Sequence, residues 1–130
     1  MYRRLKFSSA ARQDLVAIQA TSRRLFGPEQ AVRYKLLIAQ ALRDIDDEPE
    51  RPDSQARPVL GERFRSYRVE LSRKRSGTGV KRSHHIIVYV SLSGDFVGVS
   101  RILHDAMLME QHIPESHLYG DEAFLSDEEE

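Results

Sequence analysis

The sequence contains no cysteine and no tryptophan among its 130 residues. The absence of cysteine excludes disulfides, thiolate metal sites and cysteine nucleophiles together. Long apolar runs are also missing, so we expect no segment that spans a membrane. A chain of this length, with 40% apolar and 31% charged residues, is typical of one soluble globular domain. We predict a cytoplasmic protein, because a chain without cysteine fits a reducing compartment.

The net charge is zero, yet the two signs are separated along the chain. All twenty Lys and Arg residues precede residue 102, and six of the twenty acids lie in the last ten residues, DEAFLSDEEE. Residues 1–120 therefore hold twenty basic residues against fourteen acidic ones. We predict a single folded domain over 1–120 and an acidic, disordered tail over 121–130. The alternative is a tail that folds back over the basic body and competes with an acidic partner.

Two amphipathic helices are expected near the N-terminus, over residues 9–26 and 29–47. Ser8 or Ser9 can cap the first helix, because a hydroxyl accepts from an otherwise unpaired backbone N–H. Apolar side chains recur at spacings of three and four along both segments. The Gly-Pro pair at 27–28 suits a helix end followed by the first turn of a new helix. The two segments should therefore form an antiparallel helical hairpin.

The remainder of the chain has the composition of a β-sheet. Strands are predicted where β-branched and aromatic residues gather, at residues 2–7, 65–71, 84–90 and 96–103. The stretch 46–62 has three prolines and many acids, so we expect a surface loop there. The predicted fold class is α+β with the order β-α-α-β-β-β, in which the helical hairpin packs on one face of a mainly antiparallel sheet. A short helix over 104–111 should end the domain.

Alternation along the strand HHIIVYV divides its side chains between the two sheet faces. We assign the set that holds Val88 and Val90 to the helical hairpin, and the set that holds Ile87 and Tyr89 to the opposite face. That opposite face is still apolar and needs a cover. The cover is either the chain's own segment 107–118 or a helix or strand of a partner, and both alternatives stay open.

Three short patterns carry a family resemblance. They are Ala-x-x-Asp-Leu-x-x-Ile at 11–18, Phe-Gly-Pro-x-Gln-Ala at 26–31, and Arg-Ile-Leu-His at 101–104 followed by Met107. With these patterns in this order, the chain resembles the RelE/ParE toxin superfamily of bacterial type II toxin–antitoxin systems. The resemblance is closer to the ParE branch and extends from residue 3 to about residue 113.

This resemblance implies a toxin that a cognate antitoxin binds and silences in a hetero-oligomer. In the ParE branch the implied target is DNA gyrase. Relatives of the RelE type instead cut mRNA on the ribosome, and a third alternative is a non-toxic binding module on the same fold. The antitoxin contacts that we predict are Ile87, Tyr89 and Tyr34, although Tyr34 also suits the helix core.

Arg101 and His104 are the residues most able to carry chemistry. A metal-free nuclease needs an acid, a base and a cation, and these two side chains could supply part of that set. The alternative is structural: Arg101 bound to a carboxylate such as Asp14, and His104 bound to the backbone. We favour an inhibitor that acts by binding, with no catalytic residues, no cofactor and no metal site.

A basic segment, 63–82, is expected to contact the target, a nucleic acid or an acidic antitoxin. The alternative is a solvated loop that protects a sheet edge. The segment offers few aromatic side chains for stacking, so we do not expect sequence-specific reading of nucleic acid. The predicted target or nucleic-acid contacts are Arg65, Arg68, Arg73, Lys74, Arg75, Arg101, His104 and Met107.

Overall fold

The structure is a computed structural model that describes residues 2–125. Its larger elements are β1 (Leu5–Phe7), α1 (Ser9–Asp47), β2 (Gln55–Ala56), β3 (Phe64–Arg68), α2 (Arg73–Ser76), β4 (His85–Ser91), β5 (Val97–His104) and α3 (Glu122–Leu125). Short 3-10 turns are η1 (Val69–Ser72), η2 (Ser93–Asp95), η3 (Met109–Gln111) and η4 (Glu115–His117). No helix in the described part of the chain is long and apolar enough to span a membrane.

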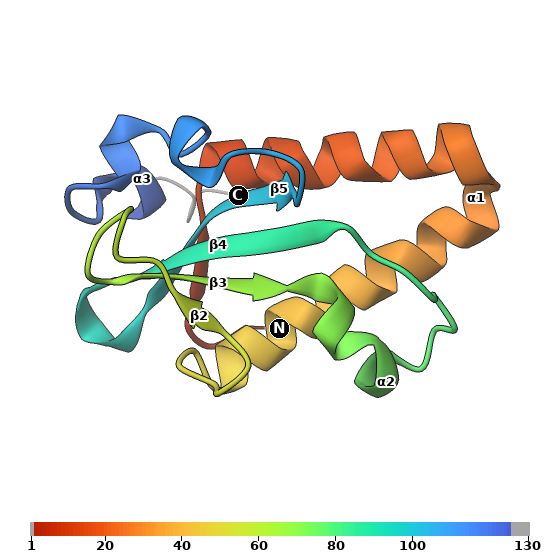
Figure 1. The fold of residues 1–130 in the computed structure, drawn as a ribbon, viewed down its shortest axis with the longest axis horizontal. Helices are drawn as coiled ribbons and strands as arrows, with labels where there is room; N and C mark the ends of the chain where they lie inside the picture. Colours follow the sequence, from red (N-terminus) through yellow and green to blue (C-terminus); the bar gives the residue numbers. More distant parts are fainter. Residues whose placement is uncertain (1, 126–130) are drawn as a thin grey trace.

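The N-terminal helical region is one element, α1, instead of the predicted hairpin of two separate helices. Its cap is Ser8, whose hydroxyl accepts from the Ala11 N–H at 3.0 Å. The helix bends sharply at Gly27, whose φ of 89° and ψ of 167° lie outside the helical region, and Pro28 follows at the bend. In Figure 1 the two arms of α1 diverge from this bend, the first running across the top of the view and the second running diagonally below it. The Gly-Pro pair therefore marks the bend at the expected place, while helical structure continues on both sides.

Five strands form a mixed sheet in the order β1-β5-β4-β3-β2. Strand β1 runs parallel to β5, and all other neighbours are antiparallel. The predicted loop 46–62 contains the two-residue edge strand β2, which is too short to give a pattern in the sequence. Strand β3 ends at Arg68 instead of residue 71, because the chain turns into η1.

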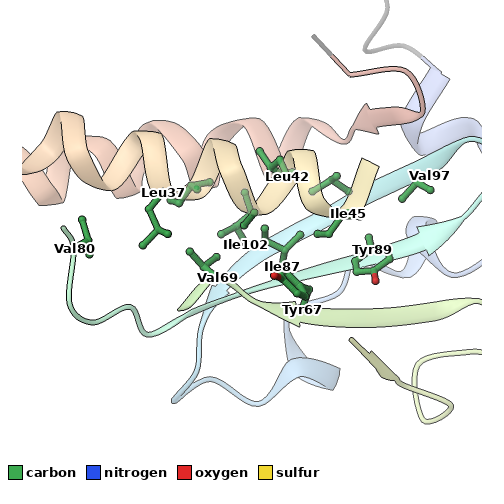
Figure 2. Packing of buried hydrophobic residues seen from close by; sticks show 14 residues of the cluster. Leu37, Leu42, Ile45, Tyr67, Val69, Val80, Ile87, Tyr89, Val97 and Ile102 are labelled. Carbon is green, nitrogen blue, oxygen red and sulfur yellow. The ribbon is translucent and has the colours of Figure 1, made fainter. Parts of the chain in front are cut away.

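The main core lies between α1 and the sheet (Figure 2). Leu37 and Ile45 of α1 lie on the side of the helix that faces the sheet in this view, where Ile87 and Tyr89 of β4 are labelled. Ile87 and Tyr89 are 0% and 1% exposed. Our assignment of this pair to the face opposite the helices was wrong. Alternation separates the two sets of a strand, but it cannot choose between them when both are apolar.

The second sheet face is buried by the C-terminal part of the chain. Val88 and Val90 pack there with Phe64 and Leu103, under Phe124. Phe124 is 0% exposed and lies so close to Gly98 that a Cβ there would be 2.7 Å from its ring. The chain therefore covers the sheet face opposite α1 with its own C-terminal segment. The residues of β4 under this cover are Val88 and Val90, and not Ile87 and Tyr89.

Two predictions about the C-terminal region need correction. The predicted helix at 104–111 is a turn followed by η3, since no amphipathic period of useful length exists there. The predicted tail begins too early, because Asp121 and α3 belong to the packed structure. Residues 126–130, the rest of that tail, lie outside the described residues.

Candidate functional site

Arg101 joins three parts of the fold. Its Nε and Nη2 donate to the two carboxylate oxygens of Asp14 on α1, each at 2.8 Å. Nη1 donates to the His112 carbonyl oxygen at 2.8 Å. Asp14 also accepts from the backbone N–H of Ile102 at 2.9 Å. This two-pronged pairing raises the pKa of Arg101 further, and it uses the guanidinium as a structural clamp.

A β-bulge in β5 places this clamp. The register with β4 shifts between Val88 and Tyr89, which leaves Ser100 as the extra residue. The Ser100 hydroxyl lies 2.7 Å from Nδ1 of His117. The Ser100 carbonyl oxygen accepts from the Ser8 hydroxyl at 2.8 Å. Burial first, and then the charge of Arg101, lower the pKa of His117. The bulge thus connects the helix cap to the C-terminal cover.

Three histidines meet where β4 begins and β5 ends. The rings of His84 and His104 are stacked with centroids 5.6 Å apart, and the ring of His85 lies edge-on to His104 at 5.8 Å. Asp105 lies 3.4 Å from Nδ1 of both His84 and His104. Nδ1 of His104 also accepts from the Ala106 N–H at 3.1 Å. The structural prediction for His104, a contact to the backbone after the strand, agrees with this hydrogen bond.

Tyr34 ties α1 to this histidine cluster. Its hydroxyl lies 2.6 Å from Nδ1 of His85 and 2.7 Å from the Ser83 hydroxyl. Burial, aided by the neighbouring charge of His104, lowers the pKa of His85 from 6.5 to about 4. Burial also raises the pKa of Tyr34. At neutral pH both groups are therefore uncharged. The described residues contain no group of three or more ligands suited to a metal ion.

The basic residues predicted as contacts divide into two sets. Arg65 donates to the Ser54 hydroxyl at 2.9 Å, and Arg75 donates to Asp44 at 2.9 Å. Hydrogen bonds from Ser72, Gln40 and Arg75 outweigh the effect of burial and lower the pKa of Asp44. Arg65 and Arg75 therefore fasten the fold, and nothing in their sequence spacing distinguished them from their neighbours.

The other set, with two neighbouring cations, forms what we call the basic edge: Arg68, Arg73, Lys74, Lys81 and Arg82. Their partners set them apart from Arg75, and exposure does not, because the Arg75 side chain is itself 46% exposed. Arg68 and Arg73 keep 51% and 44% of their side-chain surface exposed. Arg73 donates to the Lys81 carbonyl oxygen at 2.8 Å, which holds α2 against the loop before β4. Lys81 and Arg82 were in the predicted segment but not among the predicted contacts. Met107, a predicted contact, is 44% exposed in the turn after β5.

A mainly apolar groove of about 530 Å³ lies between the two arms of α1. Its floor and walls include Leu15, Ile18, Ile38 and Leu42. Val16 at its margin is 71% exposed. Cationic side chains, Arg23 and Lys35, also line it. Sequence periodicity assigned this helix face to the core, so the groove was not predicted.

These geometries set what the surface can do. Arg101 is committed to Asp14 and His112, so it offers little to a substrate. Tyr34 is half-buried against the core, while Ile87 and Tyr89 present no surface to a partner in this structure. Surfaces that remain open to recognition include the groove, the basic edge and the imidazoles of His84 and His104, which are 55% and 49% exposed.

Comparisons with known proteins assign the family. A search of curated proteins found no match. Among solved structures, the fold is similar to a chain described as the chromosomal ParDE toxin–antitoxin system from P. aeruginosa. The TM-score is 0.57 at 19% identity, covering 79% of this chain and 96% of that one. The family model described as the ParE toxin of the type II toxin–antitoxin system parDE matches residues 5–109. The chain therefore belongs to the ParE toxin family of type II toxin–antitoxin systems.

Proposed function

We propose that this chain is a growth-inhibiting toxin that a cognate antitoxin neutralises, and that it acts by binding DNA gyrase. Membership of the ParE family is the observation that carries this proposal. The similar solved chain comes from a ParDE system, which supports pairing with a ParD-like antitoxin. The finer statement about gyrase rests on the resemblance to the ParE branch.

The α1 groove is the surface that best suits the antitoxin. Groove residues are mainly apolar and lie on two neighbouring helical arms, which is the kind of surface that accepts an amphipathic helix. A helical partner segment with apolar residues at every third or fourth position would bury this surface. Arg23 and Lys35 would favour acidic residues beside that stripe. We therefore move the predicted antitoxin contacts from Ile87 and Tyr89 to the groove.

Action by binding fits the hydrogen bonds of the two residues that could act in catalysis. Arg101 is held by Asp14 and by a backbone carbonyl. Nδ1 of His104 takes a backbone N–H. These hydrogen bonds engage the Arg101 guanidinium and Nδ1 of His104, which leaves less of either side chain for acid–base catalysis on a phosphodiester. His104 and Met107 remain proposed target contacts because both are exposed.

The test of the function is controlled expression without an antitoxin. A gyrase target predicts growth arrest with DNA damage response and filamentation, while bulk mRNA stays intact. Purified protein should then inhibit DNA supercoiling by gyrase. Rapid mRNA cleavage would favour the ribosome-dependent nuclease instead. Normal growth at high soluble expression would remove both toxin functions and leave a binding module.

The groove is tested with two matched valines. Val16, in the groove, and Val59, in the loop after β2, are both 71% exposed. Val16→Glu should weaken antitoxin binding by about 2 kcal/mol, because it places a carboxylate in an apolar contact. Val59→Glu should leave binding unchanged, since it lies on another surface. Equal affinities in both variants would show that the antitoxin docks elsewhere.

A further inference from the structure

The basic edge is assembled from segments that are separate in the sequence. Arg68 ends β3, Arg73 and Lys74 lie on α2, and Lys81 and Arg82 precede β4. Lys74, Lys81 and Arg82 are exposed and form no ion pair with any described residue. The fold thus gathers five cations at one edge and leaves three of them without internal compensation.

Two carboxylates lie within this edge and only partly offset its charge. Glu70 is 4.0 Å from Arg73, and its Oε1 also accepts from the Ser83 N–H. Asp105 is shared between Arg68 and His84, at 3.3 and 3.4 Å. Side chains that share one carboxylate at these distances stay available to a further anion. The net charge of the edge is positive.

The chemistry around these cations favours a phosphate backbone over an acidic protein. Within residues 68–84, Leu71 is the one large apolar side chain that is more than a third exposed. A protein interface normally needs an apolar centre larger than a single leucine. The segment also has no Phe, Tyr or Trp, so it lacks a stacking platform for unpaired bases. Duplex phosphates need neither feature.

The loop after α2 leaves space for a close approach. Gly77 and Gly79 have φ values of 63° and 80°, and no atom lies within 4 Å of a Cβ built at either position. Ser76 and Thr78 alternate with them, and the Ser76 hydroxyl already bonds the Thr78 N–H. Because the two glycines carry no side chain, this turn does not block the approach of a ligand to the cations on either side of it.

We propose that the basic edge binds the phosphate backbone of double-stranded DNA without reading its sequence. The surface is separate from the α1 groove, so DNA and antitoxin can occupy the toxin independently. This activity goes beyond the proposed inhibition of gyrase and does not depend on it, since it needs only the cations of this chain.

The test is fluorescence anisotropy of a labelled DNA duplex with the purified full-length protein over a series of salt concentrations. A footprint of about four phosphates predicts that the logarithm of the association constant falls with the logarithm of salt at a slope of about −3 to −4. Two duplexes of unrelated sequence should bind equally. A large difference between them, or no binding at low salt, would overturn the proposal.

Charge reversal locates the surface. Lys74→Glu combined with Arg82→Glu should lower the affinity at least about tenfold and reduce the salt slope by about 2. The matched control is Arg24→Glu with Arg33→Glu, which makes the same charge change at exposed positions of α1. Equal losses in both variants would mean that net charge alone drives binding.

Two further measurements distinguish DNA from an acidic protein as the partner of the basic edge, and distinguish the DNA-binding proposal from the proposed inhibition of gyrase. If Lys74→Glu/Arg82→Glu leaves DNA binding intact but weakens antitoxin binding, the basic edge is an acidic-protein site and the proposal fails. Gyrase inhibition is measured separately. A chain that binds DNA through this edge but spares gyrase would refute the proposed target while supporting the DNA surface.

Discussion

The two faces of the sheet are both apolar, yet they are covered in different ways. One face is buried by α1, a 39-residue helix that lies within the residues matched by the family model. The other is buried by residues 109–125, whose elements are two 3-10 turns and a four-residue helix. These residues begin where the match to the ParE family ends.

The covers also differ in what holds them. Side chains along the whole second arm of α1 enter the main core. The C-terminal cover depends on a few anchors: Phe124 on Gly98, His117 on Ser100, and Asp121 on Ser93. Packing spread over a long helix is cooperative, whereas a few side-chain anchors permit local opening. We therefore expect damage to the first face to unfold the domain and damage to the second to release a segment.

Tyr89→Asp should have the largest effect, because it places an unpaired carboxylate under α1. Tyr89 is 1% exposed, so the expected loss exceeds about 4 kcal/mol and the protein should not fold stably. Chemical denaturation measures this loss in the free energy of unfolding. Tyr89→Phe is the control, since it keeps the buried ring and removes the hydroxyl, whose hydrogen bond to the Pro49 carbonyl is worth about 1 kcal/mol. A stably folded Tyr89→Asp protein would contradict the α1 packing described for this face.

Phe124→Ala should come next and act locally. Removing this ring leaves a cavity beside Gly98, at a cost of about 3 kcal/mol. Hydrogen exchange should then speed up over residues 109–125 while the sheet and α1 stay protected. Tyr119→Ala, at a side chain that is 72% exposed in the same segment, should change nothing. Exchange that rises equally across the whole domain would show that the two covers unfold together.

Arg101→Lys probes the clamp that touches both covers, through Asp14 on α1 and His112 in the C-terminal part. Lysine keeps the charge but loses the planar fork, so we expect a loss of about 1–2 kcal/mol in folding stability.

His104→Gln should cost less than about 0.5 kcal/mol and keep most toxicity, because His104 is half-exposed. If His104→Gln instead folds and binds antitoxin normally but loses about a hundredfold or more in activity, acid–base catalysis is the better explanation.

The dependence of stability on pH is a further effect of modest size. Folding lowers the pKa of His85 from 6.5 to about 4, so the folded state holds the neutral ring. Above pH 6.5 the His85 ring is neutral in both states and does not oppose folding. As the pH falls from 6.5 toward 4, protonation of His85 in the unfolded state lowers the free energy of unfolding. Partial exposure limits this decline to about 1 kcal/mol. His85→Asn should flatten the decline, which denaturation at several pH values can measure. An unchanged slope would assign the decline to other groups, such as His117 at the second cover.

Local patterns in the sequence determined much of this fold. The Ser8 cap, the bend at the Gly-Pro pair and strands β1, β3, β4 and β5 follow from capping, backbone freedom and residue composition, all of which act over a few residues. The pairing of Arg101 with Asp14 was predicted as one of two alternatives, because a strand-end guanidinium needs a carboxylate partner. The family motifs at 11–18, 26–31 and 101–104 pointed to the ParE branch, and the family comparison agrees.

Only the tertiary structure decided which face of β4 meets α1, where the C-terminal cover lies and which basic side chains pair with a carboxylate of the fold. Ile87 and Val88 are both apolar, so their order alone cannot say which one faces the helix. Arg75 and Lys74 are neighbours with the same charge and both are exposed, yet Arg75 pairs with Asp44 and Lys74 pairs with no carboxylate of the described residues. Such choices depend on contacts between residues tens of positions apart, and their free energy exists only once the chain has packed.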